Sequence, residues 1–186
     1  EIARAYEAAG ADCVSVLTEP KWFLGSDDIF REIRETISIP MIRKDFTVDP
    51  YQIYEAKLMG ADAVLLICAL LPTEKLKEYL VICEKLGLTA LVETHDEAEI
   101  ASAVEAGARV IGVNNRNLKN FTVDFSNSAK LRSLIPEEAV FVAESGVKDA
   151  SDVGALSAIG ADAVLVGEAL MMPMERPRLP VEPTAM

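Results

Sequence analysis

The sequence predicts a parallel α/β protein of the (β/α)8 TIM barrel class. Seven short apolar runs, beginning near residues 13, 40, 63, 88, 109, 140 and 163, are typical of buried parallel strands. Amphipathic helical segments separate these runs, and strict alternation of strand and helix favours a parallel sheet with right-handed crossovers. Unit lengths of roughly 20 to 30 residues fit either a barrel or a doubly wound sheet.

A repeat that precedes every second strand decides between these two folds. Its four copies read helix end, Gly, Ala and then strand: AGADCVSV from Ala9, MGADAVLL from Met59, AGARVIGV from Ala106 and IGADAVLV from Ile159. The glycine supplies the left-handed conformation that ends a helix. The unit is therefore a βαβα pair, and the first pair lacks its leading strand. Completing that pair gives eight strands, so we expect residues 1–172 to hold strands two to eight of a barrel and to begin inside helix one.

Composition and charge narrow the class of partner. The chain has 186 residues, 51% of them hydrophobic, and a formal net charge of −12, which would repel nucleic acid and anionic membranes. No apolar run approaches the ~18 residues of a membrane span. We therefore expect one globular domain with a small-molecule partner. Residues 173–186 are rich in proline and are expected to form a loose tail.

The three cysteines indicate a reducing compartment. Cys13, Cys68 and Cys83 are odd in number, lie in apolar segments and have no C-x-x-C spacing. We expect buried, reduced thiols in a cytoplasmic protein, with no metal site.

Polar side chains gather at the predicted carboxyl ends of the strands, where barrels of this class place their chemistry. Lys44 follows one strand, and Glu93 and Glu144 end two others. Two carboxylates around one lysine allow acid and base roles to be divided by environment. A solvated loop lysine and a simple ion pair at the rim remain alternatives. His95 is the only histidine, and we expect it to be structural or exposed, beside a helix that Asp96 and Glu99 begin.

The later strand ends indicate anion binding. Asn114 and Arg116 follow one strand, and these residue types match hydroxyl or carbonyl oxygens and carboxylates, although asparagine also forms turns. Gly146 and Gly167 follow the last two strands and would let the backbone approach a phosphate closely. Tight turns are the alternative for both glycines.

These motifs resemble one family. The segments RKDFTVDPYQIYEAKLMGADAVLLI, LVETHDEAE, IGVNNRNLKNFTVD, AESGV and LVGEAL, together with VLTEPKWFLGS near the start, are similar in order to indole-3-glycerol-phosphate synthases over about residues 1–172. The resemblance implies that 1-(2-carboxyphenylamino)-1-deoxyribulose 5-phosphate is closed, decarboxylated and dehydrated to indole-3-glycerol phosphate in tryptophan biosynthesis, with no cofactor.

The resemblance also implies a role for each residue of the site. Lys44 is similar to the family's general acid, Glu93 to its acid/base carboxylate and Asn114 to the residue that orients the substrate. The remaining matches are substrate-binding or phosphate-binding positions: Phe23, Phe46, Arg116, Glu144 and Ser145 for the substrate, and Gly146, Gly167 and Glu168 for the phosphate.

One departure from the family pattern bears on activity. The family's first strand, with a lysine, a glutamate and a serine, and the N-terminal helices before it are not found in this sequence. We therefore expect impaired turnover, and open strand edges that allow self-association. Two alternatives remain open: an inactive barrel fragment that still binds phosphate, and another sugar-phosphate barrel enzyme.

Overall fold

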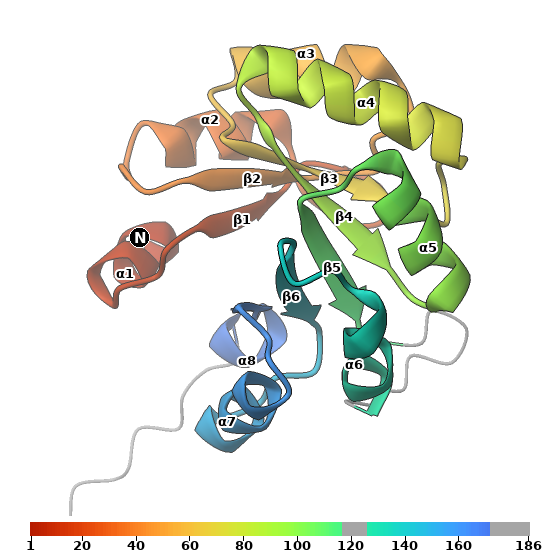
Figure 1. Cartoon of the computed structure of the whole chain (residues 1–186). Helices are drawn as coiled ribbons and strands as arrows, with labels where there is room; N and C mark the ends of the chain where they lie inside the picture. Colours follow the sequence, from red (N-terminus) through yellow and green to blue (C-terminus); the bar gives the residue numbers. More distant parts are fainter. Residues whose placement is uncertain (117–125, 172–186) are drawn as a thin grey trace, which may run out of the picture.

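The computed structural model describes residues 1–116 and 126–171, and it contains one parallel sheet whose strands follow one another in sequence order (Figure 1). The seven strands are β1 (Val14–Leu17), β2 (Met41–Lys44), β3 (Ala63–Ile67), β4 (Thr89–Thr94), β5 (Val110–Asn114), β6 (Val140–Glu144) and β7 (Ala163–Leu165). Each begins within one residue of its predicted position. The prediction of a parallel α/β fold is confirmed.

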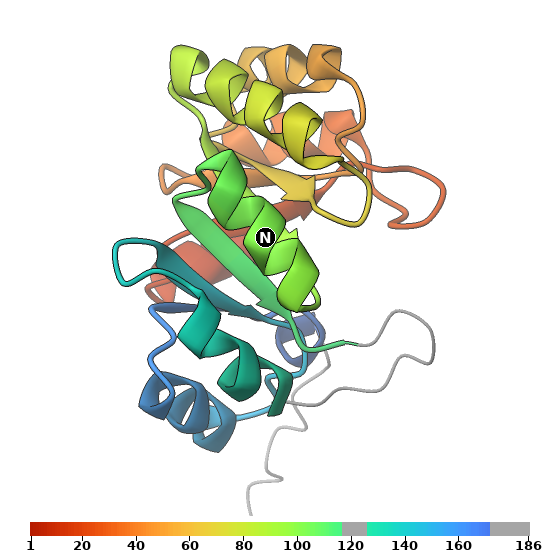
Figure 2. The same ribbon diagram turned by 45° about the vertical axis from the view of Figure 1, so that its right-hand side comes forward.

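The helices show how this sheet is wound. They are α1 (Ile2–Ala8), α2 (Asp27–Arg34), α3 (Pro50–Leu58), α4 (Thr73–Leu86), α5 (Glu97–Ala106), α6 (Ser126–Leu131), the 3₁₀ turn η1 (Arg132–Leu134), α7 (Ala150–Ala158) and α8 (Glu168–Met171). A sheet in strict sequence order has no point at which the winding reverses, unlike a doubly wound sheet. The strands curl and the helices lie along the outer face, which gives a partial barrel (Figures 1 and 2).

Two separate apolar clusters fill the two sides of the sheet. The larger cluster lies between strands and helices and includes Phe30, Tyr79 and Phe141, all fully buried. A smaller cluster occupies the inner side of the curl and contains Ile42, Leu65, Ile67, Leu91 and Val142. Alternate residues of a strand point to opposite faces, so a strand buried on both faces reads as a continuous apolar run.

The Gly-Ala repeat has a structural role beyond ending helices. Its glycines are left-handed, with φ between +84° at Gly160 and +89° at Gly107. In two copies the aspartate that follows also fixes the neighbouring strand: Asp62 accepts a hydrogen bond from the Met41 amide at 2.9 Å, and Asp162 accepts one from the Phe141 amide at 2.8 Å. The repeat therefore ends one helix and holds the start of the strand beside it.

The outermost strands, β1 and β7, pair only with β2 and β6 within the described residues. The helices next to them meet, because the Tyr6 hydroxyl on α1 donates to Met171 Sδ on α8 at 3.3 Å. The prediction of buried cysteines is correct for Cys83 and wrong for Cys13, which is exposed just before the edge strand β1. Cys68 is half-buried.

Two further expectations from the sequence concern membrane-spanning helices and the C-terminal tail. None of the described helices combines the length and the apolar character needed to cross a membrane. The predicted loose tail at 173–186 lies outside the described residues.

Candidate active site

Lys44, Glu93 and Glu144 meet on the inner side of the curled sheet, at the carboxyl ends of β2, β4 and β6. Every second residue of a strand points to the same face. Each of the three charged residues comes two positions after an apolar residue of the inner cluster, so its side chain also points inward. The pairs are Ile42 and Lys44, Leu91 and Glu93, and Val142 and Glu144. Lys44 Nζ lies 3.5 Å from Glu93 Oε2 and 3.7 Å from Glu144 Oε2. Glu93 and Glu144 lie 49 and 100 positions after Lys44 in the sequence, and the fold brings the three side chains into one charged cluster.

Glu93 is held as an anion although it is buried. Its Oε2 faces Lys44, while its Oε1 accepts a hydrogen bond from Asn114 Nδ2 at 3.2 Å and lies 3.3 Å from His95 Nε2. Burial alone would raise the pKa of Glu93, but the contacts with His95, Lys44 and Asn114 outweigh it and lower the pKa to about 2. At neutral pH this carboxylate is therefore ionised and available as a base.

Glu144 has the opposite protonation. Its side chain is almost fully buried, and its Oε1 has no hydrogen-bond partner among the described residues. Burial, reinforced by the negative charge of Glu93 and partly offset by Lys44, raises the pKa of Glu144 to about 8. Two carboxyl groups around one lysine therefore differ in protonation at neutral pH, and such a difference allows acid and base roles to be divided.

His95 lies closer to this cluster than the sequence indicated. We expected a structural or exposed histidine, and the structure places its half-buried ring between Glu93 and Glu99. The predicted start of α5 is confirmed, because Asp96 caps the helix by accepting from the Glu99 amide at 2.9 Å. His95 comes two residues after Glu93, but it lies just past the end of β4, where strand alternation no longer fixes the direction of a side chain. The sequence therefore left the contact between the two side chains open.

An aromatic pair borders the site on the side of β1 and β2. The rings of Phe23 and Phe46 are 4.6 Å apart between centroids and tilted by 39°. Glu19 holds the loop that carries Phe23, because its carboxylate accepts hydrogen bonds from the backbone amides of Lys21, Trp22 and Phe23. The two phenylalanines thus form a tilted aromatic pair that offers apolar surface at the ends of β1 and β2.

A hollow of about 730 Å³ opens on the other side, between the ends of β6 and β7. Ser145 and Gly146 border it with left-handed backbone, at φ +68° and +88°, and Gly167 borders it from the loop before α8. Arg116 donates to Glu168 Oε2 across the hollow at 2.9 Å. The structure therefore brings together Arg116, Gly146 and Gly167, for which the sequence suggested anion binding, with Ser145 and Glu168, which the family resemblance placed at the site.

A buried arginine behind the site was not singled out in the sequence. Arg43 points to the outer face of β2, where its guanidinium lies 3.1 Å from Asp27, 3.5 Å from Asp45 and 2.9 Å from Glu55. This cluster connects the segments on either side of Lys44 to helices α2 and α3. An arginine-lysine pair at the end of a strand gives no indication of which cation faces inward until the register of the strand is known.

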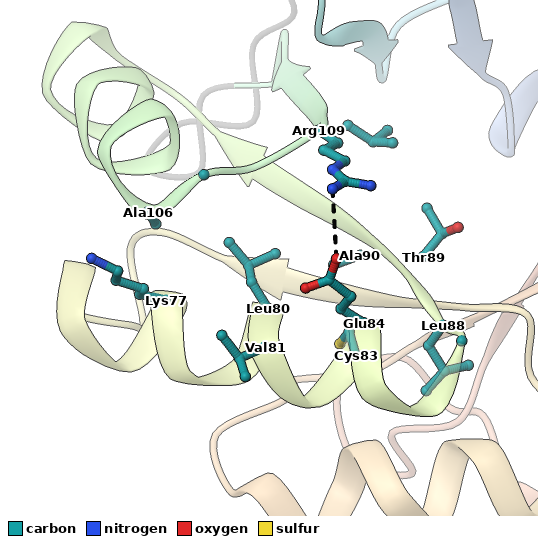
Figure 3. A pocket seen from close by; sticks show the side chains of 13 residues that line it. Lys77, Leu80, Val81, Cys83, Glu84, Leu88, Thr89, Ala90, Ala106 and Arg109 are labelled. Carbon is teal, nitrogen blue, oxygen red and sulfur yellow. Dashed lines mark ion pairs between the residues drawn. The ribbon is translucent and has the colours of Figure 1, made fainter.

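A second cavity, of about 540 Å³, lies at the opposite ends of the strands, between the last turns of α4 and α5 and the starts of β4 and β5 (Figure 3). The ion pair of Arg109 and Glu84, 3.6 Å apart, spans it. Cys83 at its base is unreactive, because burial raises the pKa of the thiol to about 12. Since the amino-terminal ends of barrel strands serve stability, we assign no chemistry to this cavity.

No group of three or more His, Cys, Asp or Glu side chains in residues 1–116 and 126–171 is arranged to hold a metal ion.

Comparison with known sequences gives one family. The family model of indole-3-glycerol phosphate synthase matches residues 1–178. The indole-3-glycerol phosphate synthase of Ruminiclostridium cellulolyticum is 62% identical over 171 residues, which are 92% of this chain and 66% of that protein. The enzyme of the same name from Leuconostoc mesenteroides is 56% identical over 170 residues, 91% of this chain and 65% of the relative. The chain thus spans just under two thirds of the length of these curated relatives.

Solved structures support the fold. A phosphoribosylanthranilate isomerase from Thermotoga maritima superposes with a TM-score of 0.68 at 20% identity, covering 90% of this chain and 81% of that one. An N-acetylmannosamine-6-phosphate 2-epimerase from Clostridium perfringens gives a TM-score of 0.73 at 15% identity, covering 91% and 77%. At such low identity these similarities concern the fold alone.

Proposed function

Because the chain belongs to the indole-3-glycerol phosphate synthase family, we propose that the protein converts 1-(2-carboxyphenylamino)-1-deoxyribulose 5-phosphate into indole-3-glycerol phosphate, carbon dioxide and water. The observation that carries this proposal is the position of Lys44 between an ionised and a protonated carboxyl group, 3.5 Å from Glu93 and 3.7 Å from Glu144. Such a cluster can both donate and accept protons at neutral pH.

The steps of the reaction suit these groups. Lys44 donates a proton to the carbonyl oxygen of the ribulose chain as the aromatic carbon that bears the carboxylate attacks the carbonyl carbon. Loss of carbon dioxide restores the aromatic ring and leaves an alcohol. That hydroxyl then leaves as water when it is protonated and Glu93 removes a proton from the new ring. The protonated Glu144 carboxyl group, 3.7 Å from Lys44 Nζ, is a source for the second proton.

The surroundings of the cluster fit the ends of this substrate. The Phe23 and Phe46 rings offer an apolar surface for the anthranilate ring, and Asn114, fixed on Glu93, can orient the substrate's polar groups. Arg116 can bind the anthranilate carboxylate in place of Glu168. We assign the phosphate to Gly146, Gly167 and the backbone of Glu168, and Ser145 to the adjoining part of the substrate, since all four border the hollow after β6 and β7.

A turnover assay tests this proposal. The synthetic substrate is added to this chain and to the longest form of the protein that its gene encodes, and the product is followed by indole fluorescence. Product formation by the longest form supports the proposal. Binding of the product analogue or of phosphate without turnover in either form favours a non-catalytic barrel, and turnover of a different sugar phosphate favours another enzyme of this fold.

We also propose a location, a restriction on partners and a mode of self-association for this protein. The free cysteines fit a reducing compartment, so we place the protein in the cytoplasm. The net charge of −12 disfavours nucleic acid as a partner. The unpaired sides of β1 and β7 offer backbone groups through which two copies of this chain could associate.

A further inference from the structure

His95 is fixed by Glu99 in an orientation that directs one ring nitrogen at Glu93. The Glu99 carboxylate accepts the His95 backbone amide at 2.8 Å and lies 3.1 Å from ring Nδ1. The carbonyl of His95 accepts from Asn127 Nδ2 on α6 at 3.2 Å. These contacts fix both the backbone and the ring of His95. The ring atom Nε2 is buried and faces Glu93 Oε1 at 3.3 Å, but it makes no aligned hydrogen bond among the described residues.

The two oxygens of Glu93 face different partners. Oε1 is shared by His95 and Asn114, and Oε2 faces Lys44. Rotation of the carboxylate would move Oε2 away from Lys44, so the contacts at Oε1 determine where the base points. A misplacement of about 1 Å in such a group can slow a reaction about a hundredfold.

The charges around His95 favour its cationic form. Glu93 faces it from β4 and Glu99 from α5, while Lys44 on β2 and the protonated Glu144 on β6 lie beyond Glu93. The contact with Glu93 has the largest effect and, with Glu99, raises the pKa of His95 to about 9 in spite of burial.

We propose that His95 is a positioning residue for Glu93: the imidazolium, oriented by Glu99, holds the Glu93 carboxylate ionised with its free oxygen directed at Lys44. This inference rests on the proposed function for its effect on turnover, but the ion pair itself can be measured without any substrate. In this role His95 acts through Glu93, which it contacts, and needs no contact of its own with the substrate.

The first test uses the fact that His95 is the only histidine of this chain. Its ring signals in a ¹H–¹⁵N NMR titration therefore need no assignment. We expect a midpoint near pH 9 in the unmodified chain, a fall of about one unit or more in Glu93→Gln, and a smaller fall in Glu99→Gln. A midpoint at or below the ordinary value of about 6.5, or one that Glu93→Gln leaves unchanged, overturns the proposal.

The second test is kinetic and uses the longest form of the protein. His95→Leu keeps the volume and removes both polar contacts, whereas His95→Gln restores a donor at the position of Nε2. We expect His95→Leu to lower kcat about tenfold with KM changed less than about threefold, and His95→Gln to recover most of the loss. Unchanged kcat in His95→Leu, a loss confined to KM, or equal loss in both variants contradicts a positioning role.

The two tests separate the inference from the proposed function. If the unmodified protein does not turn over the substrate, the proposed function fails, and the NMR titration still decides whether His95 is paired with Glu93. If His95→Leu does not fold, the titration of the unmodified chain and the comparison of His95→Gln with it decide the proposal without that variant.

Discussion

The Glu144 carboxyl group occupies the space that Gly112 leaves open. Gly112 lies on the inner side of β5, next to Glu93 in the register with β4, and a Cβ built there would overlap Glu144 Oε1. Glycine is required at this position for the room it provides, because its backbone is ordinary strand. The same small residue thus lets a large carboxyl group lie buried within reach of Lys44.

Gly112→Ala should therefore displace Glu144 and disturb the cluster. We expect a loss of stability of about 1–3 kcal/mol from overpacking, measured by urea denaturation, together with a large loss of turnover. Gly154→Ala is the matched control, since a Cβ there meets nothing within 4 Å and the residue lies inside helix α7. That change should stabilise the protein by about 0.5–1 kcal/mol. Equal effects of the two substitutions would contradict the packing described.

The protonation of Glu144 predicts how stability depends on pH. Its folded pKa of about 8 exceeds the ordinary value of 4.5, so the folded state binds a proton that the unfolded state releases between these values. The stabilisation that this proton provides is complete below pH 4.5, declines as the pH rises from 4.5 to 8, and is lost above pH 8. Urea denaturation at pH 5 and pH 6.5 should therefore give a lower free energy of unfolding at pH 6.5.

Glu144→Gln is the control for this pH effect. The amide stays neutral, so the decline between pH 5 and 6.5 should largely disappear in the variant. His95 does not confuse this comparison, because its raised pKa of about 9 affects stability only above its ordinary value of 6.5. Glu93, with a pKa near 2, stays ionised throughout the range. A decline that persists in Glu144→Gln would assign the effect to another group.

The strands and the converging rim could be predicted from sequence because both follow from periodicity. The Gly-Ala repeat marks where helices end, and the parity of each strand then decides which residues point inward. Lys44, Glu93 and Glu144 each come two residues after an apolar residue that faces inward, so their meeting is a consequence of the register.

The supporting residues could not be predicted, because their roles depend on contacts that no local pattern records. Gly112 lies in an apolar run and gives no sign that another strand's carboxylate needs its space. His95 stands next to a capping sequence, which accounts for its neighbours without indicating that its ring turns back to Glu93. Arg43 and Lys44 are equivalent cations in sequence, and only the strand register separates the one buried on the outer face from the one that meets Glu93 and Glu144.

Lys44→Ala should abolish turnover with little effect on stability. Loss of a general acid typically lowers the rate by about 10²–10⁴-fold. Glu93 keeps its contacts with His95 and Asn114, so its charge is not left unpaired, and the free energy of unfolding should change little. Lys130→Ala is the control, since Lys130 pairs with Glu97 at 3.3 Å on the exposed surface of α6. Retained ring closure in Lys44→Ala would remove this lysine from its assigned role.

Arg43 should matter for stability far more than an ordinary surface arginine. Its guanidinium is buried, and besides three carboxylates it contacts Thr18 Oγ1 at 3.1 Å and the carbonyl of Gln52 at 3.0 Å. Thr18 in turn donates to Asp45 at 2.5 Å, so the end of β1 and the loop after Lys44 are held by the same group.

Arg43→Met keeps the apolar stem and removes the charge, which leaves Asp27, Asp45 and Glu55 facing one another around an uncharged side chain. Removing one partner of a buried ion pair typically costs about 3–5 kcal/mol, and we expect a loss of this size in the free energy of unfolding measured by urea denaturation.

Arg31→Met is the matched control, because Arg31 lies on α2 at 3.8 Å from Asp28 with both side chains exposed, and such pairs contribute about 0–1 kcal/mol. The Arg43→Met variant should also lose turnover, since the end of β1 and the loop after Lys44 would no longer be held. Similar small losses in both variants would show that the carboxylates around Arg43 are compensated by water or by protonation.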